Sequence, residues 1–233
     1  MKLSVVIPVY NEELTIKEVI DKVLAVPIDK EIIVVDDGST DRTPEILKES
    51  RDKVTIIYNS LINIGKGAAI RIGFEHIKGD VVIIQDGDLE LDPSEYPRIV
   101  GPIMEGKADV VYGSRFLGEK GRKETSLVNY LANKLLTFLT NVLYKTNITD
   151  METAYKCFRA DVIKKMRLKS IGFEIEPELT AKALRLGYKI YEVPISYHPR
   201  RIEEGKKIGF MDGFKAIYYL FKWRFAGMEE IEK

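Results

Sequence analysis

The chain has 233 residues, and its 36 lysines and arginines balance 36 aspartates and glutamates, so the formal net charge is zero. This balance gives no basic footprint for nucleic acid, which is therefore not an expected partner. The single cysteine, Cys157, excludes an internal disulfide and is typical of a reducing compartment. The apolar run after Lys2 is too short for a signal peptide, and no apolar run reaches the ~18 residues that cross a bilayer. We expect a cytoplasmic globular chain with one sizeable core.

Predicted strands and helices alternate through the first half of the sequence. Runs of β-branched and aliphatic residues predict strands at 3–8, 31–36, 54–58, 81–84 and 109–113. Apolar residues at helical spacing between these runs predict helices that end near residues 24, 49, 77 and 104. This alternation predicts right-handed βαβ units and a parallel sheet, with 81–84 as its buried central strand.

Two common nucleotide-binding loops are missing from this half. The first strand-to-helix turn, residues 9–13, contains no glycine, so it lacks the pyrophosphate cradle of a dinucleotide fold. The segment Gly65-Lys66-Gly67 lacks the further glycine and the serine or threonine of a P-loop. The sequence therefore disfavours both a dinucleotide fold of the usual kind and a P-loop kinase.

The central strand leads into an acidic segment, Gln85-Asp86-Gly87-Asp88-Leu89-Glu90. In a regular strand Asp86 and Asp88 would lie too far apart to bind one ion closely. Gly87 between them permits a tight bend that brings the two carboxylates together. Hard oxygen ligands at the carboxyl end of a sheet suit Mg²⁺ or Mn²⁺ carrying a diphosphate. Taken alone, an acidic surface turn is the commoner origin of an Asp-x-Asp segment.

Two amphipathic helices mark the second half of the chain. Residues 127–144 place large apolar side chains on one face and asparagines and threonines on the rest, while residues 210–225 combine seven aromatic residues with three basic ones. One interpretation packs both helices on the sheet. The other places both in a membrane interface, with the aromatic side toward the lipid and the lysines toward headgroups. A helix near 177–186 and a strand at 189–197, expected at a sheet edge because of Pro194, lie between them.

Six short motifs occur in order along nearly the whole chain. They are Val5-Val6-Ile7-Pro8-Val9-Tyr10-Asn11-Glu12, Val34-Val35-Asp36-Asp37-Gly38-Ser39-Thr40-Asp41, Asn63-Ile64-Gly65-Lys66-Gly67, Gln85-Asp86-Gly87-Asp88-Leu89-Glu90, Gly113-Ser114-Arg115 and Glu192-Val193-Pro194. In this series they resemble family 2 glycosyltransferases, and most closely the dolichyl- or polyprenyl-phosphate sugar synthases. The resemblance implies a single α/β domain of glycosyltransferase A type, with a mixed, mostly parallel sheet flanked by helices and with C-terminal interfacial helices. The catalytic domain would cover 1–209, including helix 127–144, and a C-terminal amphipathic helix would cover 210–233.

The resemblance also implies roles for individual residues. The nucleotide-sugar donor would be bound by Pro8, Tyr10, Glu12, Asp37, Gly65, Lys66 and Asp86. A Mg²⁺ or Mn²⁺ ion would be held by Asp86, Asp88 and Glu90. The acceptor phosphate would be bound by Arg115, Asn133 and Lys134. The expected catalytic residues are Asp88, Arg115, Arg200 and Lys206, the last two in a loop that closes on phosphates. Structural alternatives stay open, with Glu12 as a first-turn helix acid, Arg115 in a surface ion pair and Lys206 in a solvated loop.

The implied reaction transfers a hexose, with inversion, from GDP-mannose or UDP-glucose to a dolichyl or polyprenyl phosphate. A metal ion bridging the donor phosphates would offset the charge of the leaving group. The second pKa of a phosphate monoester is about 6, so this acceptor needs no base. One alternative is transfer to a hydroxyl of a glycan or diacylglycerol, which needs a carboxylate base such as Glu176 or Glu178. The other is a non-catalytic nucleotide-sugar-binding subunit.

The sequence departs from the resemblance in two places. Gly87 stands where alanine is frequent in the family, and no membrane-spanning tail follows Phe225. Lipid binding is therefore expected to come from the interfacial helices, peripherally at the cytoplasmic membrane face, or from a membrane partner subunit.

Overall fold

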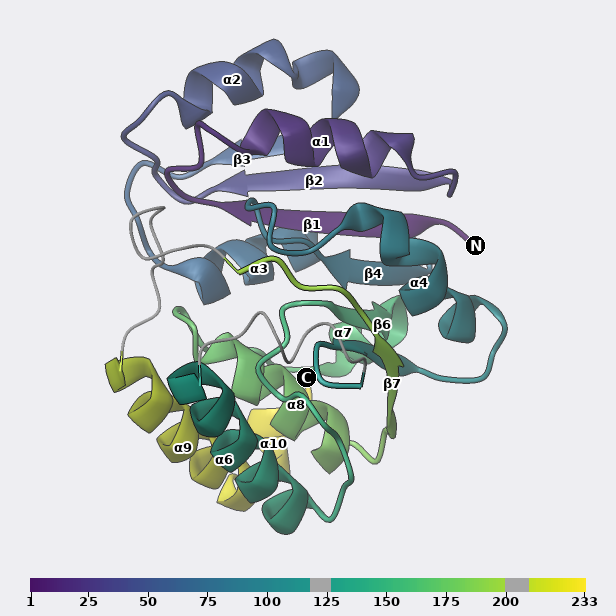
Figure 1. Cartoon of the computed structure of the whole chain (residues 1–233), viewed down its shortest axis with the longest axis vertical. Helices are drawn as coiled ribbons and strands as arrows, with labels where there is room; N and C mark the ends of the chain where they lie inside the picture. Colours follow the sequence, from purple (N-terminus) through teal and green to yellow (C-terminus); the bar gives the residue numbers. More distant parts are fainter. Residues whose placement is uncertain (118–126, 200–209) are drawn as a thin grey trace.

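The computed structural model describes residues 1–117, 127–199 and 210–233. Within these residues seven strands form one sheet in the order β3-β2-β1-β4-β6-β5-β7 (Figure 1). The strands are β1 (Leu3–Val9), β2 (Lys30–Asp36), β3 (Ile56–Asn59), β4 (Val81–Ile84), β5 (Val110–Ser114), β6 (Lys156–Arg159) and β7 (Ile190–Pro194). The predicted central strand, β4, is the middle strand and is fully buried. The edge position predicted from Pro194 is confirmed, since β7 ends the sheet.

The sheet is mixed because β6 runs antiparallel to both of its neighbours, β4 and β5. The other pairs of described strands are parallel. The sequence does not predict β6, because two of its four residues, Lys156 and Arg159, are charged. Its insertion between β4 and β5 carries the residues before Lys156 to the edge of the sheet where β4 and β5 end.

Helices cover both faces of the sheet. On one face, α1 (Ile16–Ala25) and α4 (Tyr96–Met104) share a core with β1 residues such as Val5 and Ile7. On the other face, α3, α7 and α8 share a core with Val6. Side chains of β1 therefore alternate between two apolar cores, which explains its continuous apolar sequence. The remaining bounds are α2 (Thr43–Glu49), α3 (Lys66–Glu75), α6 (Leu127–Tyr144), α7 (Ala160–Lys165), α8 (Ile175–Arg185), α9 (Phe210–Phe225) and α10 (Met228–Ile231).

The helices α6 and α9 pack against each other and against α8, away from β1 and β2 (Figure 1). A small core that contains Leu136 and Leu220 joins α6 to α9. The Trp223 side chain on α9 is fully buried beside Ala181 on α8 and Ile231 on α10. No helix in the described parts of the chain has the length and apolarity needed to cross a membrane. Both helices are thus attached to the fold.

Candidate active site

The carboxyl ends of the parallel strands β1, β2 and β4 meet at one edge of the sheet. The predicted donor residues at the end of β1 are Pro8, Tyr10 and Glu12. Their loop is tied to the loop after β2, because Asn11 Oδ1 accepts a hydrogen bond from Thr40 N (2.8 Å) and Glu12 N donates to Thr43 Oγ1 (2.8 Å). These hydrogen bonds hold the two loops together beside the acidic tip of β4, which is the segment Asp86-Gly87-Asp88.

Asp37, directly after β2, holds the loop that precedes α3. Its carboxylate oxygens accept hydrogen bonds from Ile64 N (2.9 Å) and Gly65 N (2.7 Å). Gly65 has a φ of 125°, and a Cβ atom there would lie 2.4 Å from Ile171 O, so this position requires glycine. The structure thus brings Asp37 and Gly65 together. The binding of the nucleotide-sugar donor by Asp37 stays a prediction.

A row of alternating charges runs from the end of β4 to β6. Lys66 Nζ lies 2.8 Å from Asp86 Oδ1 and 3.2 Å from Glu176 Oε1. Glu176 Oε2 in turn pairs with the buried Lys156. Burial opposes the charged form of each group, but Asp86 and Glu176 raise the pKa of Lys66, and Lys156 and Lys66 lower the pKa of Glu176. Lys66 and Asp86 are thus neighbours, and Glu176 is a poor base because two lysines stabilise its anion.

The other candidate base, Glu178, serves the packing of α8. Its side chain is fully buried and pairs with the equally buried Lys182 at 2.7 Å. It also accepts a hydrogen bond from Ser170 N (2.7 Å). These contacts explain the buried Glu178 as a residue that stabilises the fold, without a role in binding a substrate.

The predicted metal residues do not form a complete metal site by themselves. Asp88 Oδ1 accepts a hydrogen bond from Glu90 N (3.1 Å), and Glu90 Oε2 accepts one from Tyr197 OH (3.2 Å). Among the described residues no three His, Cys, Asp or Glu side chains are grouped closely enough to hold an ion. Asp86 and Asp88 fit Mg²⁺ or Mn²⁺ in the arrangement where one or two carboxylates bind and substrate phosphates and waters complete the shell.

The chain bends at Gly87, as predicted. Its φ is not in the left-handed region that the described glycines Gly38 and Gly65 adopt. In addition, a Cβ atom at Gly87 would lie 3.3 Å from Val9 Cγ2, so the missing side chain lets the acidic tip approach β1. Thr15 Oγ1 donates a hydrogen bond to Gly87 O (2.9 Å) and holds the tip there.

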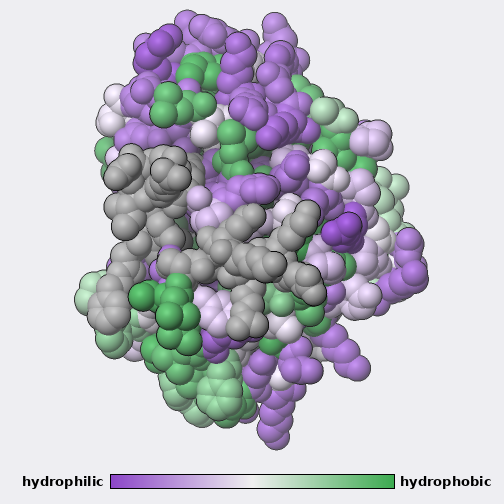
Figure 2. Space-filling model, viewed as in Figure 1, coloured by the Kyte–Doolittle hydropathy of each residue, from purple (hydrophilic) through white to green (hydrophobic). Residues whose placement is uncertain are grey.

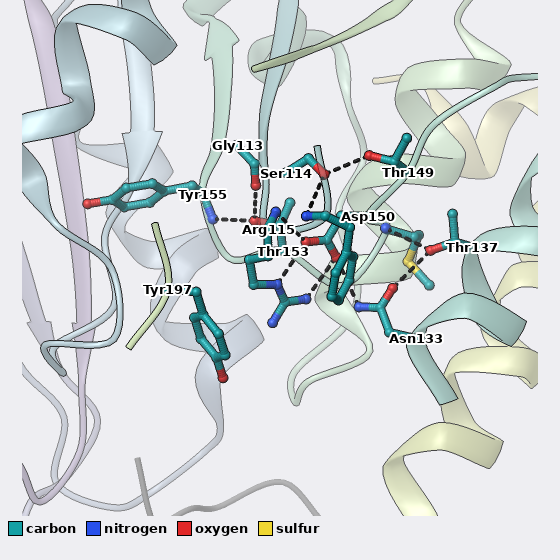
Figure 3. A network of polar contacts seen from close by, with 12 residues as sticks. Gly113, Ser114, Arg115, Asn133, Thr137, Thr149, Asp150, Thr153, Tyr155 and Tyr197 are labelled. Atoms are coloured by element: carbon teal, nitrogen blue, oxygen red, sulfur yellow. Dashed lines mark hydrogen bonds and ion pairs between the residues drawn. The ribbon is translucent and has the colours of Figure 1, made fainter. Parts of the chain in front are cut away.

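Figure 3 shows Arg115, directly after β5, paired with Asp150. Arg115 Nε and Nη2 lie 2.7 and 2.8 Å from the two carboxylate oxygens, and Asn133 Nδ2 from α6 donates to the same carboxylate (2.9 Å). The guanidinium also lies over the rings of Phe116 (5.5 Å) and Tyr197 (5.1 Å). Burial opposes the charge of Asp150, but Arg115 lowers its pKa. An acceptor phosphate would therefore meet a guanidinium already oriented by a carboxylate.

The three predicted acceptor residues do lie together. Lys134 Nζ lies 5.0 Å from the ring centroid of Phe116, the same ring that the Arg115 guanidinium contacts. Asp150 is absent from the sequence prediction, because the segment before β6 has no regular pattern. Glu192 on β7 fixes this segment, since its carboxylate accepts hydrogen bonds from Thr149 N (2.8 Å) and Asp150 N (3.1 Å). The predicted residues Arg200 and Lys206 lie outside the described residues.

The helix α6 buries three polar side chains together with Leu136 and exposes most of its large apolar ones. Asn133, Thr137 and Thr140 are buried. The large exposed side chains on α6 are Leu127, Val128, Leu131, Leu135, Phe138 and Val142. Those on α9 are Met211, Phe214, Tyr218, Phe221 and Phe225. We call these two groups the apolar face of α6 and α9, and Figure 2 shows hydrophobic residues gathered over this part of the molecule.

The fold matches solved glycosyltransferases. Glucosyl-3-phosphoglycerate synthase from Mycobacterium tuberculosis superposes in its complex with uridine diphosphate with a TM-score of 0.73 at 23% identity, covering 96% of this chain and 80% of that one. Its complex with Mn²⁺, uridine diphosphate and phosphoglyceric acid gives 0.72 at 24% identity, covering 97% and 79%. The mixed sheet, with its acidic tip at the end of the central strand, is therefore the glycosyltransferase A-type fold in a single domain.

The sequence comparisons define the family. The pattern of glycosyl transferase family 2 matches residues 4–167, and the chain belongs to this family. It is 34% identical to the low-salt glycan biosynthesis hexosyltransferase Agl6 of Haloferax volcanii, over 94% of this chain and 52% of that protein. It is 32% identical to the dolichol-phosphate mannosyltransferase of Pyrococcus furiosus, over 96% of this chain and 64% of that protein. The chain thus spans about half to two thirds of the length of these relatives.

Proposed function

We propose that this glycosyltransferase transfers a hexose from a nucleotide-diphospho sugar to a polyprenyl or dolichyl phosphate at a membrane surface. The observation that carries the proposal is the two-sided α6. Its polar face binds Asp150, the partner of Arg115, while its other face is apolar and exposed. One helix therefore links the candidate acceptor-phosphate residues to a surface suited to lipid. The names of the two curated relatives support the same class of reaction.

A bilayer is the occupant that best fits the apolar face of α6 and α9. These helices carry four basic residues, Lys134, Lys215, Lys222 and Arg224, and one acidic residue, Asp212, although the whole chain is neutral. Basic residues beside an apolar helix face favour anionic headgroups over a neutral protein surface. The aromatic side chains on α9 are typical of the boundary between headgroups and acyl chains.

In the proposed reaction a phosphate oxygen of the acceptor attacks the anomeric carbon, and the bond from that carbon to the donor diphosphate breaks with inversion. Asp86 and Asp88 would hold a divalent ion that stabilises the departing diphosphate. Lys66 stays cationic at neutral pH, because Asp86 and Glu176 outweigh the effect of burial and raise its pKa, so it adds positive charge beside the same phosphates. Arg115, held by Asp150, attracts the acceptor dianion, which needs no base.

The transfer is tested with a soluble acceptor. Purified protein, Mn²⁺ and labelled GDP-mannose or UDP-glucose should glycosylate farnesyl phosphate and leave farnesol unmodified. Asp88→Asn should lower kcat by about 10²–10³ without changing the melting temperature, because charge stabilisation at the leaving group is lost. The matched control Asp109→Asn changes a surface aspartate before β5 and should keep full activity. Transfer to farnesol alone, or an active Asp88→Asn variant, would contradict the proposal.

The membrane surface is tested by sedimentation with vesicles that contain phosphatidylglycerol. Phe138 on α6 is 61% exposed and Leu14, before α1, is 90% exposed, so an aspartate is tolerated at either position. We expect Phe138→Asp to weaken sedimentation and Leu14→Asp to leave it unchanged. Equal sedimentation of both variants would show that α6 does not contact the bilayer.

A further inference from the structure

Glu152 is a half-buried residue whose carboxyl group the mechanism above does not use. It lies in the turn between Asp150 and β6, and its Oε1 atom is buried without a hydrogen-bond partner in the described parts of the chain. An ionised oxygen in this state is costly, since neither water nor a donor stabilises it. A buried carboxyl oxygen without a partner is stabilised either by protonation of the group or by a bound ligand that hydrogen-bonds to it.

Charged groups from several elements act electrostatically on Glu152. They are Arg115 after β5, Asp150 before β6, Lys156 on β6 and Glu176 on α8. These neighbours already pair with each other, Arg115 with Asp150 and Lys156 with Glu176. Glu152 is therefore the surplus acid of the cluster. Burial is the main effect that raises its pKa to about 7, with Glu176 and Asp150 adding to it and Lys156 and Arg115 opposing it.

Glu152 lies between the end of β4, which carries predicted donor residues, and the end of β5, which carries Arg115. Because β6 runs antiparallel to β4, with Cys157 opposite Ile83, the residues before β6 lie beside those after β4. On the other side, Thr153 Oγ1 donates a hydrogen bond to Gly113 O (2.6 Å) and fixes the turn to the end of β5. The turn that carries Glu152 thus lies between the end of β4 and the end of β5.

We propose that Glu152 is a further acceptor-phosphate residue, which acts as a neutral carboxylic acid and donates its O–H to a phosphate oxygen that does not attack. This inference rests on the proposed function, because it adds a residue to the same acceptor site. An ionised carboxylate would repel the phosphate dianion, so acceptor binding takes up a proton from solvent onto Glu152. The proton can return to solvent after transfer, because the product phosphodiester carries one negative charge fewer and leaves the site.

The pH dependence of transfer to farnesyl phosphate tests the inference. For the native chain, kcat/KM for the acceptor should fall about tenfold per pH unit above the pKa of Glu152, as the neutral form is lost. Glu152→Gln keeps an N–H donor and cannot ionise, so its value should stay level from pH 7 to 9. Glu152→Ala has no hydrogen-bond donor in its side chain, so its kcat/KM for the acceptor should be lower than the native value at every pH. The control is Glu95→Gln, since burial also raises the pKa of Glu95 but its carboxylate accepts a hydrogen bond from Ser196 N (3.1 Å), and its profile should follow the native one.

The outcomes separate this inference from the proposed function. A Glu152→Gln variant that folds but fails at every pH would make Glu152 a base and overturn the inference. A Glu152→Gln profile that falls like the native one would overturn it too. Absence of any native transfer to farnesyl phosphate contradicts the proposed function instead. Calorimetry without donor, in two buffers of different ionisation enthalpy at pH 7.5, then measures binding directly, and proton uptake by the native chain but not by Glu152→Gln supports the role of Glu152.

Discussion

Two amphipathic helices of this protein, α1 and α6, bury faces of different polarity. α1 buries Ile16, Val19, Ile20 and Val23 and turns its charged residues to solvent. α6 buries Asn133, Thr137 and Thr140 together with a single large apolar side chain, Leu136, and exposes six others. Both sequences have clear helical spacing, so the spacing identifies each helix without showing which face is buried.

The surface beneath each helix explains the difference. α1 covers the apolar face of the sheet, where burial of aliphatic side chains dominates. α6 covers the segment around Asp150, whose carboxylate and backbone need hydrogen-bond partners that α6 supplies. An unsatisfied buried polar group costs about 1–3 kcal/mol, so the polar face of α6 turns inward. The apolar face is left exposed, as the proposed membrane contact requires.

The sharpest test of this comparison places the same charge on each apolar face. Val19 is 0% exposed and Leu135 is 52% exposed. Val19→Asp should lower the free energy of unfolding by about 4 kcal/mol, because an unpaired charge enters the core. Leu135→Asp should change it by less than about 0.5 kcal/mol and weaken vesicle binding instead. Urea unfolding of both variants measures the contrast, and equal losses would show that the apolar face of α6 is covered without a membrane.

The polar core under α6 should depend on its ion pair. Asp150→Asn should cost about 3 kcal/mol of unfolding free energy, because Arg115 loses its carboxylate partner in a buried site. The matched control is Asp21→Asn, which removes the carboxylate of the exposed Lys53–Asp21 pair (2.8 Å) and should cost less than about 1 kcal/mol. In kinetics, Asp150→Asn should raise KM for the acceptor more than KM for the donor. Similar losses in both variants would remove the distinction between the two regions.

Acid should weaken the same core. Burial opposes the charge of Asp150, but Arg115 lowers its folded-state pKa, so the pair contributes fully at neutral pH. That contribution falls as pH drops below the unfolded value of about 3.9 and through the lower folded pKa. Between pH 5 and 3 the native chain should therefore lose more stability than Asp150→Asn. Parallel curves from chemical unfolding would contradict the assignment.

The smallest expected effect comes from two opposite substitutions on α6, threonine to valine on its buried face and valine to threonine on its exposed face. Thr137 Oγ1 accepts a hydrogen bond from Met151 N (3.1 Å) and donates one to Asn133 Oδ1 (3.0 Å), so Thr137→Val should cost about 1–2 kcal/mol. The reverse exchange, Val142→Thr at a position 60% exposed, should stay within about 0.5 kcal/mol. Thermal unfolding compares the two, and a greater cost at residue 142 would place the wrong face inside.

The amino-acid sequence alone determined the α/β class, the central place of residues 81–84 and the edge place of β7. These follow from local signals, such as runs of β-branched residues and a proline, which fix backbone preference over a few residues. The ordered motifs predicted the family, which the match over residues 4–167 confirms. They also named Lys66 and Asp86, which the structure joins in one ion pair.

The tertiary structure decided what the local pattern leaves open. Only the antiparallel insertion of β6 brings Asp150 to Arg115 and Lys156 to Glu176, pairs that lie 35 and 20 residues apart in sequence. The buried face of α6 was likewise set by its hydrogen bonds to the segment around Asp150 and by the packing of Leu136 against α9, and not by its own spacing. In each case the deciding contact joins segments that are distant in sequence. Such a contact leaves no periodic pattern in the sequence, so it cannot be predicted before the fold is known.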